Sequence, residues 1–99
     1  MKKLEKHLDH IREELEGAIE YAEDYIGEKM KGNATKAQKF REMAMQEMQH
    51  AANWYEWTEQ YCSDLTAIMP LSAEDMEEWD KCKRHYADKI AIVKYMLDR

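Results

Sequence analysis

The stretch Phe40-Arg-Glu-Met-Ala-Met-Gln-Glu-Met-Gln-His-Ala51 decides the fold, because small and apolar residues recur in it every three or four positions. This spacing continues beyond both ends of the stretch and marks one face of a helix. The face consists of Ala37, Phe40, Ala44, Ala51, Trp54 and Thr58. Glu47 falls within this apolar stripe, and His50 follows it one turn later. The stretch therefore predicts a long helix whose buried face contains a carboxylate.

Two further helices flank this one, so that helices are predicted at about 3–31, 35–68 and 72–97. The first has an apolar stripe that consists of Leu4, Leu8, Ile11, Leu15, Ala18, Ala22 and Tyr25. The third turns inward Trp79, Cys82, Tyr86, Ile90, Val93 and Leu97. Short connections make neighbouring helices antiparallel, which predicts an all-α, up-down-up three-helix bundle with residues 1–99 as one domain. The second helix is the longest, and we expect it to pack against both others.

Turn and capping residues set the predicted ends of these helices. Gly32 most easily adopts the left-handed conformation that ends a helix, so the first helix should stop there. Thr35 is the predicted N-cap of the second helix, and Pro70 ends that helix. Ser72, followed three residues later by Asp75, resembles a capping box at the start of the third.

Composition and charge exclude several classes of protein. Only three glycines and one proline interrupt the 99 residues, which favours a few long helices. The net charge of −6 argues against nucleic-acid binding, because phosphate contacts need a basic surface. No apolar run approaches the roughly 20 residues that span a bilayer, and no signal peptide opens the chain, so we expect a cytoplasmic protein without membrane contact. Cys62 and Cys82 are expected to pack as small apolar residues.

Three side chains form a candidate metal site. An unpaired buried carboxylate is costly, so Glu47 calls for a cation or a dense set of hydrogen bonds. On ideal helices, His50 lies roughly 90° and Glu14 roughly 80° to the same side of their apolar stripes. In an antiparallel pair such equal offsets point out of one face, so Glu14, Glu47 and His50 should converge. Two carboxylates and an imidazole suit Fe, Mn or Zn.

The predicted surroundings of this site are apolar. They consist of Met43, Trp54, Trp57 and Tyr61 with Tyr21 opposite. Such a surface needs a cover, either the third helix or a second copy of the chain. For Trp54, Trp57 and Tyr61, packing against the third helix is favoured over a role in lining a ligand pocket or a dimer interface. His7 and His10 lie on the same side. They either form an access path for metal or, as favoured, are ordinary surface residues.

The sequence resembles the ferritin-like superfamily, closest in spacing to the rubrerythrin type of di-iron helical hairpin. The matching residues, without a gap, are Glu14, Tyr21, Gly32, Phe40, Ala44, Glu47, His50 and Ala51. The resemblance implies that Glu14, Glu47 and His50 are iron ligands and that Glu47 bridges two metals. It also implies that Tyr21 contacts the ligands without binding metal itself. A complete di-iron bundle needs a Glu and a Glu-x-x-His from each of two hairpins, and this chain has one such set. We therefore expect a homodimer, as in small encapsulated ferritins, to complete the site.

A second resemblance points to another class of function. The opening Met1-Lys-Lys-Leu-Glu-Lys-His-Leu8 and the stretch Glu14-Leu-Glu-Gly-Ala18 are similar to small helical proteins encoded in prophages of Gram-positive bacteria. On this alternative the chain is a phage-derived structural or accessory protein that binds a phage structural partner. The site would then be degenerate and free of metal, and Glu47 would hydrogen-bond to Tyr21, His50 or a buried water. Whether the protein is an enzyme stays open between these alternatives.

Overall fold

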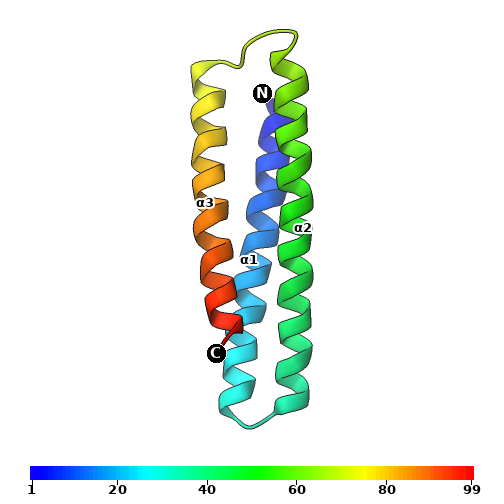
Figure 1. Ribbon diagram of the computed structural model, residues 1–99, viewed down its shortest axis with the longest axis vertical. Helices are drawn as coiled ribbons and strands as arrows, with labels where there is room; N and C mark the ends of the chain where they lie inside the picture. The colour runs from blue at the N-terminus through cyan, green and yellow to red at the C-terminus, as the bar shows by residue number, and fades with distance from the viewer.

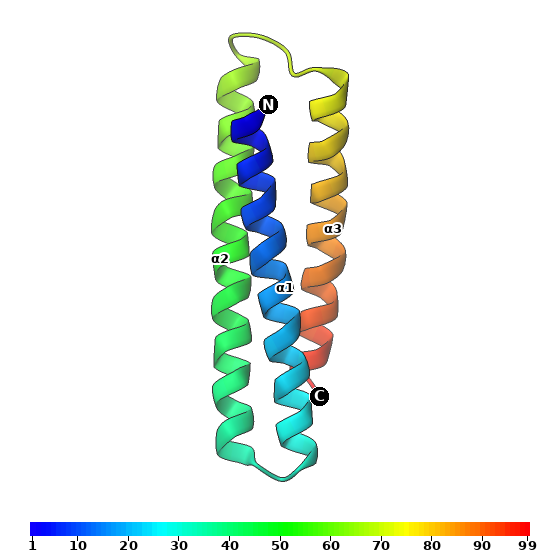
Figure 2. The same cartoon turned by 180° about the vertical axis from the view of Figure 1, so that it is seen from behind.

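Three long helices make up the fold. The computed structural model describes all 99 residues and contains α1 (Lys2–Met30), α2 (Ala34–Thr66) and α3 (Ala73–Leu97) (Figure 1). Successive helices run in opposite directions, so the predicted all-α, up-down-up bundle is confirmed (Figures 1 and 2). The bundle is a rod with extents of 55 × 18 × 17 Å. None of its helices has the length and apolar character needed to cross a membrane.

The helix ends agree with the predicted turn chemistry except at the start of α2. Gly32 has a φ of +82°, the left-handed conformation expected of it. This tight turn lets α2 begin at Ala34, so the predicted N-cap at Thr35 is wrong and Asn33 takes that position. The predicted cap of α3 is confirmed, because the Asp75 backbone N–H donates to the Ser72 hydroxyl at 3.1 Å.

The central helix of the bundle is α1, which contradicts the expectation that the second helix packs against both others. α3 lies mainly on α1 and barely touches α2. The reason lies in the sizes of the buried side chains. Those of α2 are mostly small, such as Ala37, Ala44 and Ala51, and let α2 lie close to α1. Those of α1 include the largest fully buried side chains of the bundle, from Leu4 to Leu15, and these offer both neighbours an apolar surface.

Two apolar clusters follow one another along the rod. One contains Leu15 of α1 and Ala51 of α2, and the other contains Ala18 and Ala44. Glu47 lies on α2 between Ala44 and Ala51, at the level where the clusters meet. Cys62 and Cys82 are buried free thiols, as predicted.

Candidate metal centre

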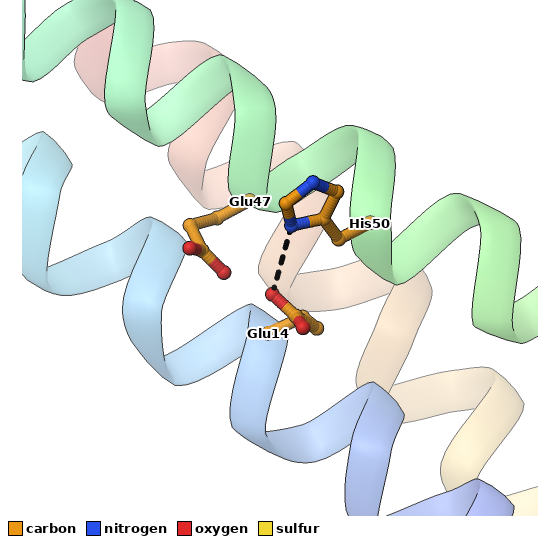
Figure 3. Close-up of side chains that lie close together, drawn as sticks. All are labelled: Glu14, Glu47 and His50. Carbon is orange, nitrogen blue, oxygen red and sulfur yellow. Dashed lines mark ion pairs between the residues drawn. The ribbon is translucent and has the colours of Figure 1, made fainter.

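The three predicted site residues come together on one face of the α1–α2 hairpin. Glu14 projects from α1, while Glu47 and His50 project from successive turns of α2 (Figure 3). One ligand atom of each lies within 4.8 Å of the other two. The His50 Nδ1 and a Glu14 oxygen are the closest pair that can form an ion pair, at 3.4 Å. The predicted convergence of the three side chains is therefore confirmed.

This face is open to solvent. The His50 side chain is 55% exposed and that of Glu14 is 23% exposed, and Glu47 is half-buried. α3 runs behind the hairpin, on the far side from the three side chains (Figure 3). Of the two covers considered from the sequence, the third helix is thus excluded, and the site keeps one open side.

Gly17 makes room for the Glu47 side chain. A Cβ atom at Gly17 would lie 3.2 Å from the Glu47 Oε2 and 3.3 Å from its Cδ, closer than ordinary contact. The glycine sits in the interior of α1, where it costs about 1 kcal/mol relative to alanine. Helical periodicity did not single out Gly17, although a glycine inside a strong helix pattern is itself a sign of close packing.

The two carboxylates share one environment, and this changes the acidity of Glu47. Hydrogen bonding to Glu14, then burial, then the charge of Glu14 raise the pKa of Glu47 from 4.5 to about 7. The nearby His50 acts in the opposite direction and offsets only part of this rise. Near neutral pH the pair therefore holds a proton that a bound cation could replace.

The donor set and its spacing fit a transition-metal ion. Metal–ligand distances of about 2.0–2.2 Å place the ligands of one ion roughly 3 to 4 Å apart. Since the three ligand atoms already lie within 4.8 Å of one another, small side-chain rotations would bring them to such an ion. An oxygen and nitrogen ligand set with an open side suits Fe, Mn or Zn.

A ladder of stacked rings continues from the site along the same face. The His10 ring is stacked on Trp54 at 4.0 Å between centroids, and the His7 ring on Tyr61 at 5.0 Å. Trp57 packs edge-on against Trp54 and is 54% exposed. Trp54 and Tyr61 thus stack on histidines of α1, and Trp57 packs on Trp54, so the favoured packing against the third helix is wrong for these residues.

A different aromatic residue of α2 contacts the third helix. The Tyr55 ring lies 5.3 Å from that of Trp79 and 4.3 Å from that of Tyr86. Tyr21, which the resemblance makes a support of the ligands, keeps that role only as a prediction. Its hydroxyl forms no hydrogen bond with Glu47, and its ring lies against Phe40 at 6.3 Å.

Comparison with known proteins yields no relative that bears on these residues. No protein family, curated protein or solved structure matches this chain. The chemistry of the site therefore has to be argued from its own geometry.

Proposed function

We propose that the protein binds a transition-metal ion, Fe, Mn or Zn, through Glu14, Glu47 and His50. The observation that carries the proposal is that two carboxylates and an imidazole from two helices have ligand atoms within 4.8 Å of one another. A cation there would replace the proton of the Glu47–Glu14 pair and offset the repulsion between the carboxylates.

One chain supplies half of a two-metal site of the ferritin-like kind, so the proposal includes a homodimer. The hairpin face that holds the ligands is open, and Trp57 on it is 54% exposed and Met43 36% exposed. A second copy across this face would cover these apolar side chains and bring a second set of ligands. Bound Fe or Mn would supply redox chemistry, in which two Fe(II) or Mn(II) ions give two electrons to a small oxidant such as peroxide, which takes up two protons and is reduced to water; Zn, which is redox-inert, would not.

Metal analysis tests the proposal. Protein purified without chelator is expected to contain Fe, Mn or Zn in stoichiometric amount, and anaerobic addition of Fe(II) should raise the melting temperature. Glu47→Gln and His50→Ala should abolish both effects. Glu42→Gln is the matched control, because Glu42 is exposed on the same helix and outside the cluster.

Sub-stoichiometric metal together with no thermal stabilisation would contradict the proposal. Light scattering tests the dimer separately, and a monomer in the presence of bound metal would overturn the shared site.

The competing candidate is a phage-derived structural or accessory protein that uses the bundle as an interaction module. What favours it is that the three side chains satisfy one another without a cation: His50 pairs with Glu14, and no buried side-chain polar atom lacks a partner. On this alternative, the parent protein and the variants Glu47→Gln and His50→Ala would each have the same melting temperature in buffer with metal and in buffer without metal.

A further inference from the structure

A cleft lies between α2 and α3, where the two helices diverge. Its volume is about 870 Å³. Trp79, which lines it, packs against the Tyr55 ring of α2 at 5.3 Å. The connection between α2 and α3 (Figure 2) contributes Pro70 and Leu71 to its lining. The cleft exists because α3 packs mainly on α1 and leaves the adjacent side of α2 uncovered.

The cleft has an apolar base. Trp79 and Cys62 line it and are otherwise buried, and Leu71 is half-buried beside them. Met76 also lines it and is 52% exposed. A methionine at the edge of an aromatic surface adapts readily to the shape of a partner.

The rim of the cleft is acidic. Glu56 and Glu59 of α2 line it, both are exposed, and neither takes part in an ion pair. Asp80 of α3 is already paired with Lys83, the only basic residue of the lining, at 3.1 Å. The segment 42–80, which supplies most of the lining, has ten acidic residues and no Lys or Arg.

The length of the cleft indicates which kind of ligand it can hold. Its lining on α2 extends from Glu56 to Thr66, which corresponds to about 15 Å of helix, or three turns. A groove of this length between two helices, with an apolar base, matches the mode in which an amphipathic helix binds through its apolar face. The unpaired glutamates at the rim select basic flanking residues through charge complementarity.

We propose that this cleft binds a basic amphipathic helix of another protein. Its apolar face would contact Trp79 and Met76, and its Lys or Arg side chains would pair with Glu56 and Glu59. The site is independent of the candidate metal centre, because the hairpin face with His50, Trp54 and Trp57 is on the other side of α2.

A synthetic helical peptide of about eleven residues made of Leu and Lys tests the proposal, with a Leu and Glu peptide of equal length as the negative probe. Fluorescence anisotropy measures binding to the full chain. The double variant Glu56→Lys/Glu59→Lys should weaken binding of the basic peptide by about tenfold or more. The matched control is Glu23→Lys/Asp24→Lys, which makes the same change of net charge at two exposed residues of α1 and should bind like the parent protein.

The indole N–H signals of the three tryptophans locate the peptide. In NMR titrations the signal of Trp79 should shift, while those of Trp54 and Trp57 should stay in place. Equal weakening by the two double variants would show attraction to net charge alone and overturn the proposal. Shifts at Trp54 and Trp57 instead would move the binding to the other face and also overturn it. A Trp79 shift that depends on protein concentration without peptide would identify a second copy as the occupant and refute the proposed partner.

Discussion

The substitution Gly17→Ala distinguishes two effects of Gly17: this glycine leaves space for the Glu47 side chain, and it lowers the stability of α1. The added Cβ would lie 3.2 Å from the Glu47 Oε2, so the carboxylate has to move by a few tenths of an ångström. It can do so, because Glu47 is only half-buried and faces the open side of the hairpin. Functional ligands must be held within about 0.5 Å of their productive positions, so the displacement should weaken metal binding.

The two expected effects have opposite signs. In the metal-free protein, alanine in the interior of α1 should raise the free energy of unfolding by about 0.5 kcal/mol, the helix-propensity gain less the cost of moving Glu47. Metal affinity should fall by about tenfold, which corresponds to about 1.4 kcal/mol of binding free energy.

Urea unfolding with chelator measures the first effect, and competition titration of Mn(II) or Zn(II) measures the second. Gly27→Ala is the matched control, because a Cβ at Gly27 meets no atom within 4 Å. It should raise the free energy of unfolding by about 1 kcal/mol, the helix-propensity gain without the cost of moving Glu47, and leave metal affinity unchanged. Equal metal affinity in the two variants would refute the argument that Gly17 holds the space for Glu47.

Three further predictions concern Glu47 and the start of α3. Metal-free protein should lose about 1 kcal/mol of stability as the pH rises from 4.5 to about 7, because the folded state binds the Glu47 proton more tightly than the unfolded chain does. Solvent screening keeps this loss below the full effect of the pKa shift. Urea unfolding across this range checks it, and an unchanged pH profile in Glu47→Gln would contradict it. Glu47→Leu should stabilise the metal-free protein by about 1 kcal/mol, since a partly desolvated carboxylate is removed, and should eliminate any thermal shift on adding metal. Ser72→Ala should lower the free energy of unfolding by about 1 kcal/mol, because the Asp75 N–H loses its acceptor. Ser63→Ala, at an exposed position inside α2, is its control and should have a smaller effect.

Much of the candidate site was predictable from helical geometry. The offsets of Glu14 and His50 from their apolar stripes indicate one shared face, and the three side chains do meet there. Gly17 was not predicted, because the need for a residue without a side chain there arises only from the close approach of α2 to α1. The partners of Trp54 were mispredicted for a related reason: a ring beside the stripe can pack against either neighbouring helix, and the sequence pattern is the same for both.

The amino-acid sequence by itself determined the three helices, their order and the stripes that face inward, because helical periodicity, Gly32 and Ser72 act through local chemistry. Only the tertiary structure decided that α1 is the central helix, since this depends on how the large side chains of α1 and the alanines of α2 share the core. The same packing places α3 behind the hairpin, leaves Glu47 and His50 on an open face and separates α3 from α2 to form the acidic cleft. These are consequences of long-range packing, which no local pattern encodes.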